Sequence, residues 1–264
     1  VATRSELQGP ADSVGPSLLS VGARFGRSPF CAYSHDSCQT YPMTTTKIHV
    51  MRHGEVDNPD GLLYGRLPGF GLTELGHQMA QRGADYLKET DADITAVIAS
   101  PLLRAQQTAT PTARAYELPI HSDLRLIEAG NIFEGQPVNA DRRVLIKPNV
   151  LKYYRNPFEP SWGEPYAQIA SRMSAALSGA LKRAYGHEAL VVSHQSPITL
   201  LTRFARKQML AHAPWSRHCS LASITTFIFD DGTLVDIDYV EPSADLLVHA
   251  HDMTPGDSEA ALKR

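Results

Sequence analysis

The sequence predicts an α/β fold, a three-layer α/β/α sandwich with a mainly parallel central sheet. From about residue 47 to residue 240, short apolar segments typical of strands alternate with longer amphipathic segments typical of helices. Connections of that length let successive strands lie parallel, with helices covering both faces of the sheet. The last two strands are separated only by Asp231-Gly232, a strong hairpin signal, so we expect an antiparallel pair at the end.

Five segments are predicted to be strands because they are rich in β-branched and apolar residues and are bounded by turn signals. They cover residues 47–51, 94–100, 189–193, 223–230 and 233–240. Four segments have helical periodicity or helix-start residues. Thr73 is suited to cap the first helix, and Pro101 and Pro197 suit first turns, whereas Pro111 predicts a kink or an end. The predicted helices cover residues 73–88, 101–109, 165–185 and 197–210.

Composition excludes several classes of protein. The chain has 264 residues, with 25 Lys and Arg against 28 Asp and Glu, and this balance argues against a nucleic-acid binder. It contains no run of about eighteen apolar residues, which a membrane-spanning helix would need. Its three cysteines are too few for a disulfide scaffold, so we expect a cytoplasmic protein in which Cys219 is a buried thiol. The oligomeric state stays open, with a homodimer as one option.

The chain changes character near residue 43. Residues 1–42 are rich in Gly, Pro and Ser and have no strand or helix periodicity, so we expect a disordered N-terminal extension. Met43 looks like a natural start because a predicted strand follows almost at once. We expect one domain over residues 43–250 and a C-terminal tail over residues 251–264.

Cationic side chains follow three of the predicted parallel strands. Arg52 and His53 come after the first, Arg104 after the second and His194 after the third. Because ligands bind beyond the carboxyl ends of such strands, we expect these four side chains to meet there. Guanidinium and imidazole groups suit a phosphoryl dianion. The sequence has neither a Walker-type glycine loop nor tight metal-ligand spacing, so we expect side chains to hold the phosphate, with no metal and no cofactor.

Six motifs occur in order between about Lys47 and Tyr239: VMRHGEVDNP, GFGLTELGHQMAQ, IASPLLRAQQTA, LIEAGNIFEG, VVSHQSPI and CSLASITTF. Together they resemble the histidine phosphatase superfamily, also called the phosphoglycerate mutase-like family, and imply its fold. The resemblance implies that His53 is the nucleophile and forms a phosphohistidine. Arg52, Arg104 and His194 would bind the phosphoryl oxygens, and Glu128 would be the general acid and then the base that activates water.

The sequence departs from the family pattern at three places. Asn58 lies one residue closer to His53 than the family's asparagine, and Gln195 stands where a glycine is common; both are kept as substrate-binding candidates. The acid segment is one residue shorter than usual, which leaves Glu134 as a rival to Glu128. We expect Glu55 to be a structural carboxylate and His49 to lie in the core or just behind the site. We assign packing or surface roles to the other histidines, among them His212.

An insertion between the acid segment and the next helix has two readings. Such insertions commonly form lids or specificity walls, and Arg142, Arg143 and Lys147 could bind further anionic groups of a substrate. The same three residues could equally lie on a solvated helix face.

These observations favour a metal-independent phosphomonoesterase, similar to the histidine acid phosphatases, acting on a small-molecule phosphate monoester through a phosphohistidine. The alternatives are phosphoryl transfer of the phosphoglycerate mutase type and a non-catalytic module that binds phosphate or a phosphoprotein. A pure binding module would not need both a nucleophile and an acid, whereas the mutase differs only in the phosphoryl acceptor.

Overall fold

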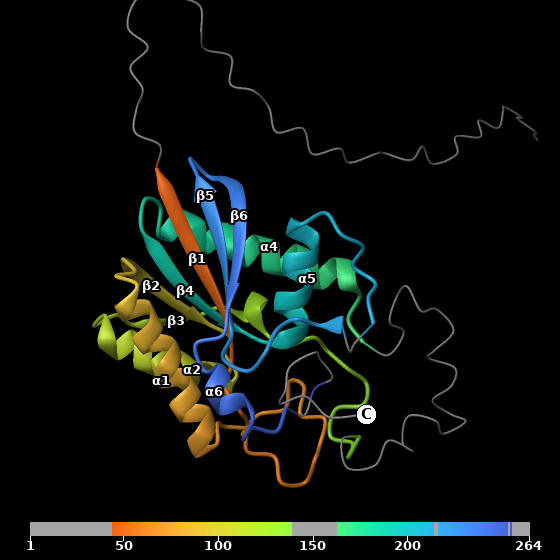
Figure 1. Ribbon diagram of the computed structural model, residues 1–264. Helices are drawn as coiled ribbons and strands as arrows, with labels where there is room; N and C mark the ends of the chain where they lie inside the picture. Colours follow the sequence, from red (N-terminus) through yellow and green to blue (C-terminus); the bar gives the residue numbers. More distant parts are fainter. Residues whose placement is uncertain (1–43, 139–162, 214–215, 253, 255–264) are drawn as a thin grey trace, which may run out of the picture. The chain divides into compact units, whose positions relative to one another are not determined.

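A six-stranded sheet forms the centre of the computed structural model, which describes residues 44–138, 163–213, 216–252 and 254 (Figure 1). The strand order is β3-β2-β4-β1-β5-β6. The strands are β1 (Thr45–Arg52), β2 (Ile94–Ala99), β3 (Ile120–Ser122), β4 (Glu188–Ser193), β5 (Ile224–Asp230) and β6 (Thr233–Val240). The first four run parallel, β5 is antiparallel to β1, and β6 is antiparallel to β5, so the predicted mainly parallel sheet is confirmed.

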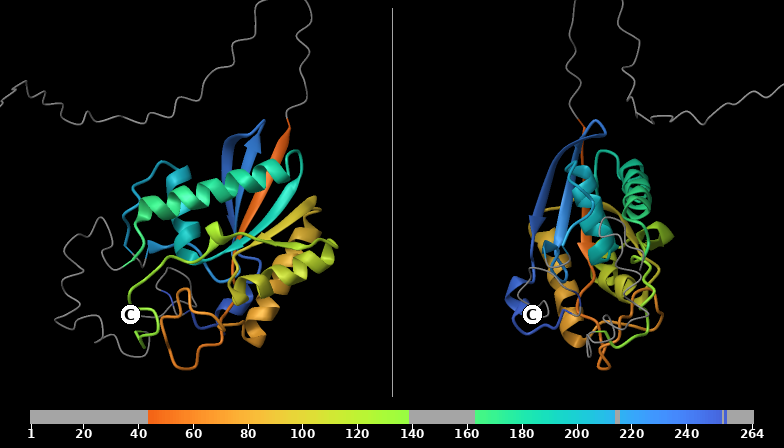
Figure 2. Two further views of the ribbon diagram at one scale, coloured as in Figure 1. Left: turned by 180° about the vertical axis from the view of Figure 1, so that it is seen from behind. Right: turned by 90° about the vertical axis from the view of Figure 1, so that its right-hand side faces the viewer.

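Helices cover both faces of the sheet (Figures 1 and 2). On one face lie α4 (Tyr166–Arg183) and α5 (Gln195–Ala205), and on the other lie α1 (Glu74–Glu89), α2 (Leu103–Ala115) and α6 (Ala244–Leu247). Each face of the sheet forms its own hydrophobic core, and successive strand residues point to opposite faces. In β4, Ala189 and Val191 pack with α4 and α5, and Leu190 and Val192 pack with α1, α2 and α6. The expected three-layer sandwich is therefore confirmed.

The helix boundaries differ from the predicted ones at prolines. α2 begins at Leu103 and continues through Pro111 to Ala115, so the predicted end near residue 109 is wrong. The alanines at positions 105, 109 and 113 form a buried stripe on the sheet, and this packing outweighs the lost hydrogen bond of Pro111. α5 begins at Gln195, before Pro197, which is tolerated because first-turn N–H groups have no partner within a helix; the helix ends at Ala205, short of the predicted residue 210.

Two glycines bring the start of α1 against the turn that follows β1. A Cβ on Gly54 would lie 2.5 Å from the carbonyl oxygen of Gly76, and a Cβ on Gly76 would lie 2.2 Å from the carbonyl oxygen of Glu55. Only glycine allows this approach. Thr73 caps α1 as predicted, since its side chain accepts the Gly76 N–H.

Several expectations fall outside the described residues: the extension over residues 1–42, and Arg142, Arg143 and Lys147 of the insertion.

Within the described ranges, none of the helices combines the length and the apolar character needed to cross a membrane. Ordered structure continues past residue 250, where the tail was expected to begin: Asp252 is 1% exposed and packs into the domain.

Candidate active site

Four of the predicted site residues meet at the carboxyl ends of β1, β2 and β4. Arg52 is the last residue of β1 and lies opposite Ser193 of β4, so His53 and His194 each follow one of two neighbouring strands. Their ring centroids are 5.1 Å apart. Arg104 comes from the first turn of α2, and all four side chains are buried. The topology thus brings together the cations that the strand ends carry.

A backbone carbonyl fixes the tautomer of His53. Its Nδ1 lies 2.8 Å from the carbonyl oxygen of Gly54, which can only accept, so Nδ1 carries the proton and Nε2 keeps a free lone pair. Burial lowers the pKa of His53 well below its usual value, and the charges of Arg104 and Arg52 lower it further. The neutral ring with a free Nε2 is the form that can attack phosphorus.

His194 is oriented by a serine. Its Nε2 lies 2.8 Å from Oγ of Ser100, whose hydroxyl can donate to it, and Nδ1 then carries the proton. Burial lowers the pKa of His194 well below its usual value, with a further contribution from Arg104. In this tautomer the neutral ring can donate a hydrogen bond through Nδ1.

The two arginines differ in how many of their donors are engaged. Arg104 donates from Nη2 to the carbonyl oxygen of Gly65 at 2.7 Å, and its guanidinium lies 4.7 Å from the centroid of the Tyr64 ring. Its Nε and Nη1 are buried and have no hydrogen-bond partner among the residues that the structure describes. In Arg52 both Nη atoms donate hydrogen bonds, and Nε has no partner within the described ranges.

Buried donors without partners converge on this site within the part of the chain that the structure describes: Arg52 Nε, Arg104 Nε and Nη1, and His194 Nδ1. Leaving such a group unpaired costs roughly 1–3 kcal/mol. A tetrahedral oxyanion accepts several hydrogen bonds at once and would satisfy these donors together. Within the described ranges of the chain, no group of three or more His, Cys, Asp or Glu side chains is arranged to hold a metal ion.

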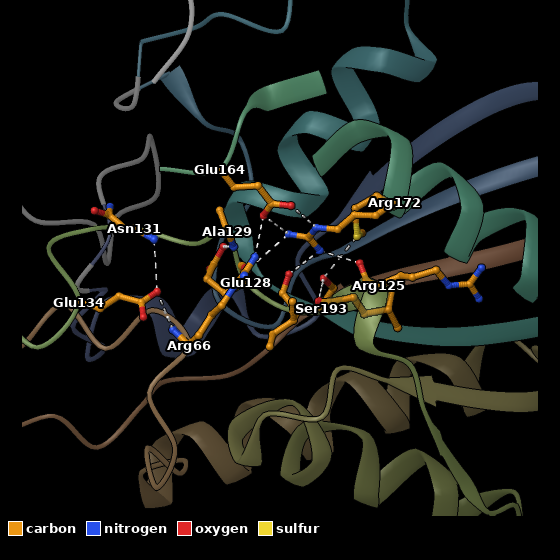
Figure 3. A network of polar contacts seen from close by, with 12 residues as sticks. Arg66, Arg125, Glu128, Ala129, Asn131, Glu134, Glu164, Arg172 and Ser193 are labelled. Carbon is orange, nitrogen blue, oxygen red and sulfur yellow. Dashed lines mark hydrogen bonds and ion pairs between the residues drawn. The ribbon is translucent and has the colours of Figure 1, made fainter. Parts of the chain in front are cut away.

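The surroundings of the Glu128 carboxyl favour its protonated form. Burial raises the pKa of its carboxyl, although the Ala129 N–H, which its Oε1 accepts at 2.7 Å, and Arg104 oppose the shift. Glu134, the rival, uses Oε1 to accept the backbone N–H groups of Arg66 and Asn131, at 3.1 and 3.3 Å (Figure 3). These contacts tie Glu134 to the surrounding loops and favour Glu128 as the acid.

A network of side chains holds the backbone of Glu128 in place (Figure 3). Arg66 donates from Nε to the Glu128 carbonyl oxygen at 2.7 Å, and Arg172 donates to the carbonyl oxygens of Arg125 and Ile127 at 2.6 Å. Glu164 joins the two arginines, with contacts of 2.7 Å to Arg66 and 2.9 Å to Arg172. The position of Glu128, the candidate acid, therefore depends on residues of α4 and of the loop after β1.

The remaining candidates have mainly structural contacts. Asn58 is bonded through both its amide nitrogen and its oxygen to the backbone of Leu62, so its side chain shapes the loop, and the expected phosphate contact has no support. Glu55 accepts from the Thr73 hydroxyl and from the backbone N–H of His251, in agreement with its expected structural role.

Two charged residues at the site were missed by the sequence analysis. Arg217 donates from Nη1 to Oε1 of Gln195 at 3.2 Å and from Nε to His212 at 3.1 Å. Asp252 forms a buried ion pair with Arg52 at 2.6 Å. Neither lies at a strand end of the predicted sheet, and the only signal for either is its charge. Gln195 and His212 thus both accept hydrogen bonds from Arg217.

Comparisons with known proteins agree with this geometry. The model of the histidine phosphatase superfamily (branch 1) matches residues 48–238. The uncharacterized protein Rv0525 of Mycobacterium tuberculosis is 49% identical over 199 residues, which cover 75% of this chain and 98% of that protein. Among solved structures, Bacillus stearothermophilus YhfR has a TM-score of 0.61 and 26% identity, covering 72% of this chain and 94% of its own.

More distant similarity supports the fold alone. The mycobacterial glucosyl-3-phosphoglycerate phosphatase Rv2419c has a TM-score of 0.59 and 21% identity, covering 74% of this chain and 97% of its own. The family match spans all the strand ends that carry the buried cations. The chain belongs to the histidine phosphatase superfamily, branch 1.

Proposed function

We propose that this protein is a metal-independent phosphomonoesterase that works through a phosphohistidine on His53. The observation that carries the proposal is the set of unpaired buried donors on Arg52, Arg104 and His194 around a neutral imidazole whose Nε2 is free. These donors supply the charge stabilisation that phosphoryl transfer needs.

The proposed reaction has two steps. In the first, Nε2 of His53 attacks phosphorus, the bond to the ester oxygen breaks, and protonated Glu128 gives its proton to the leaving oxygen. In the second, Glu128 takes a proton from water, the hydroxide oxygen bonds to phosphorus, and the bond to His53 breaks, releasing inorganic phosphate. Glu128 ends protonated, and the cycle is balanced.

The mutase alternative shares the first step and differs in the acceptor of the phosphoryl group. Phosphatases and mutases both occur among the relatives: a probable fructose-2,6-bisphosphatase of Danio rerio is 33% identical over 52% of this chain, and a probable phosphoglycerate mutase of Yersinia pestis is 30% identical over 67%. We propose water as the acceptor of the phosphoryl group and a small phosphate monoester as the substrate.

Trapping the covalent intermediate tests this proposal. Rapid quenching of the wild-type protein with a ³²P-labelled phosphate monoester should leave a phosphoryl group on His53 that is labile in acid and stable in alkali, as expected of a phosphoramidate. EDTA should change neither labelling nor turnover. His53→Ala should abolish both, whereas His77→Ala, at an exposed position of α1, should abolish neither. Turnover of His53→Ala near the wild-type rate, or a need for added divalent metal, would refute the mechanism.

A further inference from the structure

We propose that Asp252 is a positioning residue for phosphoryl transfer: it holds both terminal nitrogens of Arg52 and so directs the Nε–H of that arginine to the phosphoryl group. The inference rests on the proposed function, because it assigns a task to Arg52 at the same site. Asp252 follows α6, in the segment that the sequence analysis treated as a tail.

The hydrogen bonds of Arg52 account for four of its five N–H donors. Nη1 donates to the Cys219 carbonyl oxygen at 2.7 Å and to Oδ2 of Asp252 at 2.6 Å. Nη2 donates to Oδ1 of Asp252 at 2.7 Å and to Oγ1 of Thr254 at 2.9 Å. The fifth donor, Nε–H, is buried and unpaired within the described part of the chain. A phosphoryl oxygen therefore finds one free donor on this arginine.

The carboxylate of Asp252 is itself held in place. Its Oδ1 accepts the backbone N–H of Thr254 at 3.0 Å and the hydroxyl of the same residue at 2.6 Å. One residue earlier, the backbone N–H of His251 donates to Glu55 at 2.7 Å, which fixes the segment against the turn after β1. Asp252 and Arg52 are 1% and 0% exposed, so water does not compete for their contacts.

In this arrangement different nitrogens of the Arg52 guanidinium group orient the side chain and bind the phosphoryl group. The bidentate face of Arg52 is used for internal orientation, and the phosphoryl group meets Nε of Arg52 together with Arg104 and His194. A donor whose direction is fixed before the reaction needs no reorganisation in the transition state, which is the basis of electrostatic catalysis. If Asp252 instead competed with substrate for Arg52, its removal would raise activity.

Asp252→Asn tests the inference because it keeps the shape of the side chain. It replaces one carboxylate oxygen by an amide N–H group, which cannot accept the hydrogen bond that Arg52 donates there. With 4-nitrophenyl phosphate as the probe substrate, we expect kcat to fall about 10- to 100-fold with little change in KM, since a displacement of about 1 Å can cost ~10²-fold. Asp245→Asn is the matched control, because the Asp245 side chain is exposed and pairs with Arg82 on the surface; its kcat should be unchanged.

The outcomes separate this inference from the proposed function. If the wild type is active and Asp252→Asn has the same kcat as Asp245→Asn, the positioning role is refuted and the phosphatase proposal still holds. A higher kcat in Asp252→Asn also refutes the positioning role, because it shows that Asp252 competes with the substrate for Arg52. If the wild-type protein neither hydrolyses the probe nor binds inorganic phosphate in calorimetry, both the positioning role of Asp252 and the phosphatase proposal are refuted. If Asp252→Asn does not fold, Thr254→Val takes its place: it should lower kcat, and an unchanged kcat there overturns the inference.

Discussion

The proposed nucleophile and the proposed acid have pKa values displaced in opposite directions. Burial, with Arg104 and Arg52, lowers the pKa of His53, and burial raises the pKa of Glu128. The proposed reaction needs a neutral His53 and a protonated Glu128. Activity should therefore be lost as pH falls through the lowered His53 pKa, below 6.5, and as pH rises through the raised Glu128 pKa, above 4.5.

Glu128→Gln should remove the limb of the pH profile on which kcat/KM declines toward high pH, because no proton is left to lose there. Its kcat should fall roughly 10²- to 10⁴-fold for alkyl phosphates, whose leaving groups need a proton, and far less for aryl phosphates. The comparison is Glu134→Gln, measured with both ester classes across the pH range. If Glu134→Gln has the leaving-group dependence instead, Glu134 is the acid.

The candidate residues that the structure brings together share one property. His53, Arg104 and His194 lie at or just beyond strand ends, where the position of a side chain follows from the topology of a parallel sheet. Asp252 and its partner Arg52 are 200 positions apart, and Arg217 reaches Gln195 from an irregular segment. No local periodicity or spacing connects such pairs, so only the folded chain brings them into view.

At the scale of elements, the acid segment (residues 124–134) has little regular structure of its own. It contains one turn of 3-10 helix, η1 (Leu124–Leu126), followed by loop. Its backbone carbonyls are held by Arg66, by Arg172 and by the hydroxyl of Ser193, which donates to Leu126 at 2.8 Å. The position of Glu128 is therefore set by side chains of other elements and not by a helix or strand.

Glu164→Gln tests this dependence, because Glu164 is the carboxylate that pairs with both Arg66 and Arg172. We expect kcat to fall about 10-fold, more for alkyl than for aryl phosphates, as the acid loses its alignment. The free energy of unfolding should fall by ~1–3 kcal/mol. Kinetics with both ester classes and urea denaturation measure these effects, with Asp245→Asn as the control. A loss of stability without a leaving-group effect would contradict the link to Glu128.

At the scale of the whole molecule, the sequence predicts the sheet and the main helices because each has a strong period and clear end signals. β3 and α6 were missed, since segments of three and four residues are too short to have a period. The start of α5 was misplaced because a proline in the first turn need not be the first residue. The errors thus lie at ends and short elements, where tertiary packing decides.

Removal of residues 1–42 is the prediction that concerns the whole chain. The family match begins at residue 48, and β1 begins at Thr45. Hydrogen bonds at the start of the described chain come from Thr44, whose N–H donates to Asp231 Oδ1 at 3.0 Å and whose carbonyl oxygen accepts the Asp231 N–H at 3.0 Å. A protein that starts at Met43 keeps these contacts.

We therefore expect the free energy of unfolding of the shortened protein to lie within about 1 kcal/mol of that of the full chain, which is the scale of an ordinary substitution. Its kcat should not change. A second deletion, through residue 46, provides the comparison. It removes the Thr44 bonds, the bond from Thr45 to Asp230 at 2.8 Å and the buried Thr46 hydroxyl that accepts from Gly186, so it should be clearly destabilised. Thermal melts and turnover of the three proteins decide the matter. If the shorter deletion loses as much stability as the longer one, residues 1–42 pack on the domain, and the boundary near residue 43 is wrong.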